Sequence, residues 1–261
     1  MSAEQMSAEQ MSADLGTIVA SPTTSVPGTP DPALLDDLVA ANRILSDHGV
    51  LDAYGHISAR DPVHHRHYWI SRSMPPAQVG ANDIIACDLD NNPLRPGETR
   101  LFFERVIHGE IYKARPDVMA VLHDHSPSLI PFCNSDTRLR PMVGSAAFLG
   151  EGAPVFDIRT IDDEGDLNIC TTAQAKGLVR ALGPHALVLL RGHGAVAVGD
   201  SIRQVVRRAI IAESNAKQQM QATMLGPVHF LTASEIEFAK RMKPKDPDRA
   251  WRLWKQRAMG E

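Results

Sequence analysis

The chain has 261 residues, of which 43% are hydrophobic and 22% charged, the balance of a globular protein with one large domain or two small ones. A formal net charge of −4 excludes the broad basic surface that binds nucleic acid or an anionic membrane, and no apolar run approaches the roughly 18 residues of a membrane span. Three scattered cysteines without a CxxC pair, and no signal-peptide pattern, predict a cytoplasmic protein without a disulfide framework.

The first 30 residues differ in composition from the rest of the chain. They begin with the unit MSAEQ, repeated twice and then broken, and continue with the Ser-, Thr- and Pro-rich stretch SPTTSVPGTP. Because neither stretch can bury much apolar surface, residues 1–30 are predicted to form a disordered or loosely packed arm. A docking peptide is the alternative interpretation of the repeat. We expect one ordered domain over residues 31–243 and a helical tail over residues 244–261.

Ordered structure is expected to begin with a helix, because Asp31 suits the cap, Pro32 suits the first helical position, and apolar residues then recur at helical spacing. The predicted elements that follow are strands at 55–60, 67–70 and 83–89, a helix from 103 that ends before 116, a strand at 118–125, a helix at 171–182, two strands within 185–199 and a long helix at 201–225. No repeat of about 20 to 50 residues occurs. This mixture predicts a single α/β domain with a sheet flanked by helices.

Two histidines stand one residue apart at the end of the predicted strand VMAVLHDH. Side chains two positions apart on a strand point to the same face, so His123 and His125 project together and Asp124 projects the other way. Two imidazoles on one face can chelate a divalent ion. The alternative is a pair of hydrogen-bonded histidines with no ligand.

A third histidine, His193, lies between Gly192 and Gly194 at the tip of the predicted hairpin LLRGHGAVAV. Glycines allow a sharp turn and a close approach of the backbone to a site. Three histidines at the ends of apolar strands are typical of a catalytic metal site that leaves one position open. The cofactor is therefore predicted to be one divalent ion, and imidazole ligands suit Zn, Mn, Fe or Co.

A carboxylate, Glu104, lies at the start of the predicted helix FERVIHGEIY. If that helix start faces the metal, Glu104 is a candidate fourth ligand or acid/base; otherwise it only complements the helix dipole. His108 lies one turn further along the same face, and we interpret it as structural.

These motifs resemble the class II aldolase/adducin family over about residues 32–240. The resemblance depends on GHISAR, on the long motif E-x-x-x-H-x-x-I-Y-x-A-R-P-D-V-x-A-V-x-H-x-H-S that begins at Glu104, and on GHGAVAVG. It implies a central, mainly antiparallel sheet covered by helices, with His123, His125 and His193 as metal ligands and Glu104 as the catalytic acid/base. Members of the family are commonly tetramers with sites at subunit boundaries.

The sequence departs from the family's sugar-phosphate aldolases at the elements that bind phosphate. A Gly-Asn pair is replaced by Gly55-His56, and a Ser-Ser pair before the glutamate by Phe102-Phe103. Two phenyl rings remove hydroxyl donors and add flat apolar surface, which favours an aromatic substrate over a phosphorylated sugar. The alternative is that both phenylalanines point into the core.

Several polar groups are candidates to surround an anionic substrate. His56 is a second candidate acid, and arginine is the natural partner of a carboxylate. The candidate substrate-binding residues are Arg60, Ser71, Arg72, Ser73, Phe102 and Phe103. Each of the polar ones has an ordinary alternative role as a surface or ion-pair residue.

The leading hypothesis is a metal-dependent, non-oxidative decarboxylase of a hydroxylated aromatic or pyridine (di)carboxylate in aromatic catabolism. The GHISAR and SRSMPPAQV segments resemble those of family members that carry out this reaction. The first alternative is a retro-aldol lyase or epimerase of a small, non-phosphorylated hydroxy-carbonyl compound, and the second is a non-catalytic adducin-like domain. The tail DRAWRLWKQR places Trp251 and Trp254 on one helical face. We therefore expect a homo-oligomer, a tetramer, with this tail near a neighbour's site, and neither nucleic acid nor membrane as a partner.

Overall fold

The computed structural model describes residues 30–162, 166–242 and 245–260, so the predicted N-terminal arm lies almost wholly outside the described residues. The described strands form one seven-stranded sheet in the order β3-β2-β1-β4-β7-β6-β5. They are β1 (His56–Arg60), β2 (His67–Ser71), β3 (Ile84–Asp88), β4 (Ala120–Asp124), β5 (Val155–Phe156), β6 (Leu187–Leu190) and β7 (Gly194–Gly199). All neighbours pair antiparallel except β5 and β6, which are parallel. The prediction of an α/β domain with a mainly antiparallel sheet is confirmed.

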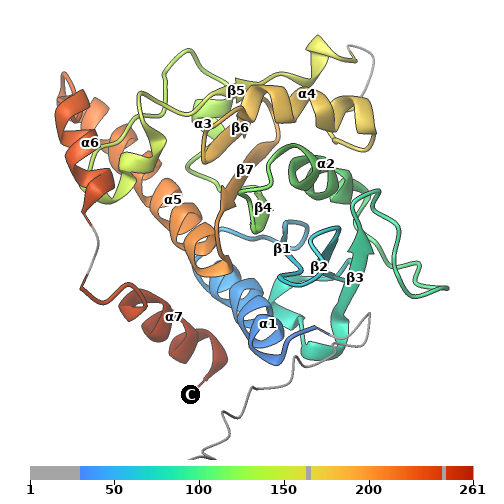
Figure 1. The fold of residues 1–261 in the computed structure, drawn as a ribbon. Coiled ribbons are helices and arrows are strands. Elements are labelled where there is room, and N and C mark those ends of the chain that lie inside the picture. Colours follow the sequence, from blue (N-terminus) through green and yellow to red (C-terminus); the bar gives the residue numbers. More distant parts are fainter. Residues whose placement is uncertain (1–29, 163–165, 243–244, 261) are drawn as a thin grey trace, which may run out of the picture.

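Helices cover both faces of this sheet (Figure 1). The α-helices are α1 (Pro32–Asp47), α2 (Val106–Ala114), α3 (Ile130–Cys133), α4 (Thr172–Leu182), α5 (Ile202–Leu225), α6 (Ala233–Arg241) and α7 (Arg249–Met259). The 3-10 turns are η1 (Pro76–Gln78), η2 (Ala81–Asp83), η3 (Phe103–Arg105), η4 (Gly144–Leu149) and η5 (Ile158–Thr160). As expected, α1 begins at an Asp31 cap, whose carboxylate accepts from two main-chain N–H groups, and α2 ends before Pro116.

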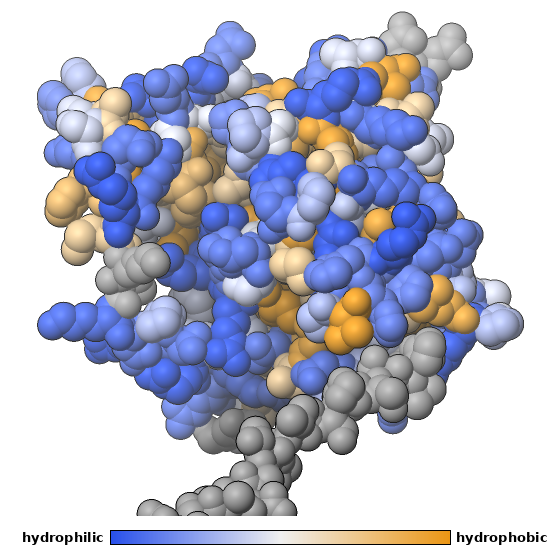
Figure 2. Space-filling model, viewed as in Figure 1, coloured by the Kyte–Doolittle hydropathy of each residue, from blue (hydrophilic) through white to orange (hydrophobic). Residues whose placement is uncertain are grey.

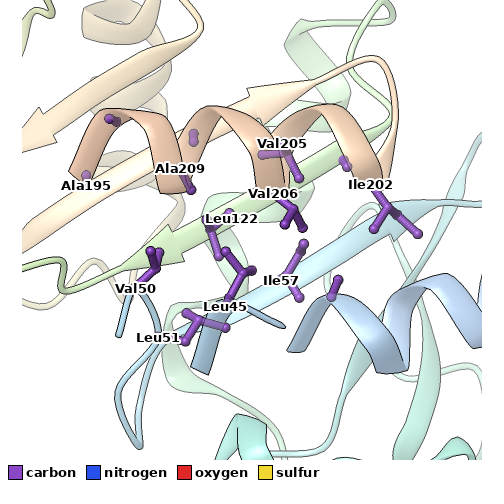
Figure 3. Close-up of a cluster of buried hydrophobic side chains, with 14 of the residues drawn as sticks. Leu45, Val50, Leu51, Ile57, Leu122, Ala195, Ile202, Val205, Val206 and Ala209 are labelled. Atoms are coloured by element: carbon purple, nitrogen blue, oxygen red, sulfur yellow. The ribbon is translucent and has the colours of Figure 1, made fainter. Parts of the chain in front are cut away.

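The two faces of the sheet belong to two apolar cores. On one face, alternate strand residues such as Ile57 and Leu122 pack against Leu45 of α1 and Val206 of α5 (Figure 3). On the other face, their sequence neighbours pack against α2 and α4. Because both faces are covered, central strands β1 and β4 are buried along their whole length. His56, Ser58 and His123 therefore lie on the α2 side of the sheet, at its centre.

The C-terminal helix α7 packs on α1 of its own chain (Figure 1). Trp251 is buried there and Trp254 packs its ring against His48. The apolar face of the tail is thus covered within the chain, so the tail's apolar surface no longer argues for a neighbouring subunit. Elsewhere, polar residues cover most of the face seen in Figure 2. Among the described residues, no helix is long and apolar enough to cross a membrane.

Candidate active site

The candidate site forms where three separate parts of the fold meet at the ends of the central strands β4 and β7. His123 lies on β4 and His125 directly follows this strand, while His193 occupies the tip between β6 and β7. Glu104 comes from η3, immediately before α2. The tip approaches β4 so closely that a Cβ atom on Gly194 would lie 2.1 Å from the carbonyl oxygen of Asp124. A glycine is therefore required at this position for the hairpin to bring its histidine to the other two.

The ligand atoms of Glu104, His123, His125 and His193 all lie within 4.8 Å of one another. An oxygen of Glu104 lies 3.3 Å from Nε2 of His123 and 3.6 Å from Nε2 of His193. The other Glu104 oxygen accepts a hydrogen bond of 2.8 Å from the Ile169 N–H, which orients the carboxylate. Four groups that are distant in the sequence thus converge with their lone pairs on one point.

Each of the three histidines has its Nδ1 atom engaged by an acceptor outside this cluster. Nδ1 of His123 lies 3.0 Å from the Ala195 carbonyl oxygen, and Nδ1 of His193 lies 2.8 Å from that of Leu167. Nδ1 of His125 lies 2.9 Å from a carboxylate oxygen of Asp52. These acceptors hold the hydrogen on Nδ1 and leave Nε2 as a lone pair directed at the cluster.

The cluster fits a divalent metal ion. Nε2 of His123 and Nε2 of His125 are buried and have no hydrogen-bond partner among the described residues. Buried nitrogens without partners are costly in a protein interior, and a shared ion would satisfy them. Three imidazoles with a nearby carboxylate are a donor set that Zn, Mn, Fe and Co accept. The residues present therefore suit the expected cofactor.

Electrostatics keep the carboxylate ionised. Burial opposes ionisation of Glu104, but His123, whose Nε2 lies 3.3 Å away, the nearby His193 and the Ile169 N–H outweigh burial and lower the pKa of Glu104 to about 2. Burial and the neighbouring His123 lower the pKa of His193 to about 4, so its ring is neutral and can act as a ligand.

A cavity of about 1080 Å³ opens above the cluster. Of the predicted site residues, it is lined by His56, Ser73, Phe102, Phe103, Glu104, His125 and His193. His56 is buried, and its ring centroid lies 4.4 Å from that of Phe102. Phe103 is 82% exposed at the cavity mouth, together with Tyr54 at 75%. Both phenylalanines line the cavity, but Phe102 is also buried in the core on the α2 side of the sheet, so the core alternative is wrong for Phe103 and holds in part for Phe102.

Three predicted substrate-binding residues do not reach the cavity. Arg60 is buried and donates hydrogen bonds to the carbonyl oxygens of His65, Tyr112, Arg115 and Val118. Arg72 binds Glu98 at 2.6 Å and the Asn82 carbonyl oxygen. Ser71 is buried at the end of β2 and does not line the cavity. The interpretation of these three residues as substrate ligands is corrected. The guanidinium groups of the two arginines already donate to groups of this chain, and Ser71 is buried away from the cavity.

Sequence reasoning did not find Asp52, which lies in the loop after α1. One of its oxygens accepts hydrogen bonds from the N–H groups of Tyr54 and Gly55, and the other is the partner of His125. The sequence signal was the turn D-A-Y-G, in which an aspartate caps the following main-chain N–H groups. Nothing local indicates that this aspartate also meets a histidine 73 positions further along the chain.

Comparison with known proteins agrees with the fold. The model of the class II aldolase and adducin N-terminal domain matches residues 36–220. The chain belongs to the class II aldolase/adducin family. An aldolase II superfamily protein from Pseudomonas syringae has the same fold, with a TM-score of 0.75 over 87% of this chain and 92% of that one, at 22% sequence identity.

Several curated proteins similar to this chain are decarboxylases. Decarboxylase tropJ from Talaromyces stipitatus is 33% identical over 240 residues, which cover 83% of this chain and 90% of that protein. A 3,4-dihydroxyphthalate decarboxylase from Arthrobacter keyseri is 30% identical over 204 residues, which cover 72% of this chain and 78% of that protein. Together with the family, these relatives identify the protein as a lyase, and carboxy-lyase is the class they favour.

Proposed function

We propose that the protein is a metal-dependent, non-oxidative decarboxylase of a hydroxylated aromatic carboxylate. The observation that carries the proposal is the cavity itself: it is lined by Glu104, His125 and His193 of the four-residue cluster, and the rings of Phe102 and Phe103 form part of its wall. Flat apolar walls above a metal site suit a planar ring whose polar substituents reach the ion. The similar decarboxylases support this class of reaction.

His123, His125 and His193 would hold the divalent ion, and Glu104 lies close enough to interact with it. When bound, the ion supplies a Lewis acid that polarises the oxygen substituents of the substrate. Because the three Nδ1 atoms are held by acceptors of this chain, the ligand nitrogens are positioned before any substrate arrives.

Glu104 is the group that moves a proton in this proposal. With its pKa near 2, it enters the reaction as a carboxylate and has no proton of its own to give. It accepts the proton of the ring hydroxyl that lies ortho to the carboxylate, and then delivers this proton to the ring carbon that bears the carboxylate. The carbon–carbon bond then breaks, its electron pair restores the aromatic ring, and CO2 leaves. The proton taken from oxygen is the one that replaces CO2, so the step balances without an external acid.

The cavity also narrows the expected substrate. Among the described residues that line it, none is an arginine or a lysine. A second substrate carboxylate therefore has no cation of this chain to pair with, contrary to our expectation for Arg72. We propose that the ortho-hydroxy carboxylate, on a benzene or pyridine ring, is the feature that this chain recognises.

The test is a matched panel of ring acids assayed for CO2 release with Zn, Mn, Fe and Co. 2-Hydroxybenzoate and 2,3-dihydroxybenzoate should react, and 3-hydroxybenzoate, whose hydroxyl is displaced by one carbon, should not. A hydroxylated phthalate and a hydroxylated pyridine dicarboxylate test whether a second carboxylate is tolerated. Cleavage of a small hydroxy-carbonyl compound to an aldehyde, without CO2 release from any ring acid, would show that the protein is an aldolase.

We propose in addition that the protein works as a homotetramer in cytoplasmic aromatic catabolism. Tyr54 and Phe103 support this assembly, because two large aromatic side chains at one cavity mouth are 75% and 82% exposed in a single chain. Light scattering of the purified protein measures the assembly directly. A mass of only the 28.5 kDa monomer would contradict the proposal.

A further inference from the structure

A continuous chain of hydrogen bonds leads from the cavity wall into the protein interior. Nδ1 of His56 lies 2.7 Å from Nε2 of His108, and Nδ1 of His108 lies 2.6 Å from Oγ of Ser58. Oγ of Ser58 lies 2.8 Å from the hydroxyl of Tyr112. Ser58 and His56 point to the same face of β1, and His108 and Tyr112 lie one turn apart on α2.

All four side chains are closed to bulk solvent, since none is more than 1% exposed. Each hydrogen in the chain must therefore be accepted by a neighbouring protein group. Among the described residues, Nε2 of His56 has no hydrogen-bond partner, and His56 lines the cavity. The series of hydrogen bonds thus ends at Nε2 of His56, which is left without a partner and faces the space for the substrate.

The direction of the hydrogen bonds follows from Tyr112, the buried end of the series. Burial raises the pKa of Tyr112, so its phenol keeps its hydrogen. The described acceptor within reach is the Ser58 oxygen.

When Oγ of Ser58 accepts from Tyr112, the Ser58 hydroxyl donates its own hydrogen to Nδ1 of His108. His108 then carries its hydrogen on Nε2 and donates it to Nδ1 of His56. With Nδ1 occupied as an acceptor, the neutral ring of His56 carries its hydrogen on Nε2. The opposite direction would leave the buried phenol hydrogen without an acceptor, which is unfavourable in a protein interior.

We propose that Tyr112, Ser58 and His108 act as positioning residues that set the tautomer of His56, so that its Nε2–H is a fixed hydrogen-bond donor to an acceptor oxygen of the substrate. The identity of that oxygen, a carboxylate oxygen of the ring acid, rests on the proposed function; the tautomer does not. A donor held in place before binding loses little free energy in orienting itself, and it replaces the cation that the cavity wall lacks.

Neutron diffraction from a deuterated crystal of the full-length, zinc-loaded protein tests the tautomer directly. We expect deuterium on Nε2 of His56 and on Nε2 of His108, and none on Nδ1 of either ring. Deuterium on Nδ1 of His56 would overturn the proposal. If the tautomer is as stated but no ring acid is decarboxylated, the proposed function fails and this proposal stands.

Substitutions of His108 test the consequence for catalysis. His108→Gln keeps a donor for His56 and an acceptor for Ser58, so kcat/KM should fall less than tenfold. His108→Leu fills the space but removes both, so kcat/KM should fall about 10- to 100-fold, the range expected for a lost buried hydrogen bond. Equal losses in the two variants would contradict a role in directing hydrogen bonds.

Tyr68→Phe is the matched control for these variants. The Tyr68 ring is as buried as that of Tyr112 and stacks on His108 with centroids 6.2 Å apart, but its hydroxyl donates to Asn91 instead of to the chain. Its removal should change kcat/KM less than about twofold, and deuterium should remain on Nε2 of His56. A loss as large as that of His108→Leu would show that packing around His108 matters, and its hydrogen-bond direction does not.

Discussion

Replacement of Asp52 by asparagine should weaken metal binding although Asp52 does not touch the metal. The oxygen that accepts from Tyr54 and Gly55 is retained in the variant, so the turn should stay folded. The oxygen that faces Nδ1 of His125 at 2.9 Å becomes an NH2 group. Two donors then face each other. The imidazole must either lose this contact or move its hydrogen to Nε2, where it blocks the ligand lone pair.

The size of the effect follows from this choice between tautomers. Loss of a carboxylate that orients a metal-bound histidine typically lowers metal affinity 10- to 100-fold, which is about 1.4–2.8 kcal/mol. The effect should lie within this range, because the two other histidines keep their main-chain acceptors. Competition with a chromophoric zinc chelator measures the change in Kd, and circular dichroism checks the fold.

Asp166→Asn is the matched control for this measurement. Asp166 lines the same cavity, and its side chain also accepts from a main-chain N–H, that of Asn168, but it contacts none of the three histidines. Removal of its charge should change the zinc Kd less than about threefold. If both variants lose affinity equally, the effect is one of net charge, and the reasoning about the His125 tautomer is refuted.

Three further predictions concern catalysis and stability. Glu104→Gln should keep zinc content and fold but lower kcat at least ~100-fold, because the amide cannot carry the proton; near-normal turnover would refute this role. Asp61→Asn should lower the free energy of unfolding by about 2 kcal/mol at pH 7, because the Asp61 carboxylate accepts hydrogen bonds from Trp69 and two main-chain N–H groups. Burial raises the pKa of Asp61, but these three donors outweigh burial and lower it. A lowered folded-state pKa stabilises the protein above the unfolded pKa, so the deficit measured by urea unfolding should shrink as the pH falls below about 4. Trp251→Ala should lower stability by about 3 kcal/mol and expose α7 to proteolysis, whereas Leu253→Ala, at a 54% exposed position on the same helix, should not.

The histidines of the candidate metal site were predictable because their signals are local. The spacing of His123 and His125 on a strand, and the glycines around His193, depend only on the neighbouring residues. The buried strands and the Asp31 cap are signals of the same kind. The long motif that begins at Glu104 then linked these pieces to one family, and so to one fold.

The prediction that Arg60 and Arg72 bind the substrate was wrong, because an arginine side chain is long and its partners can come from distant parts of the fold. Arg60 donates its hydrogen bonds to carbonyl oxygens up to 58 positions away, and Arg72 pairs with Glu98. In the sequence alone, each was an available cation near the end of a strand. Only the packing of the loops around them shows that neither is free to bind a carboxylate.

The sequence by itself determined which groups are present, the strands and helices that carry them, and the three histidines proposed as metal ligands. The tertiary structure decided how those groups are held: the acceptors of His193, His123 and His125 lie 26, 72 and 73 positions away. It also brought His108 of α2 against His56 of β1, which no local pattern indicates. The physical reason is that side-chain type and backbone periodicity are local properties. A tautomer, a hydrogen-bond direction and a free or occupied guanidinium depend instead on partners that only the folded chain brings together.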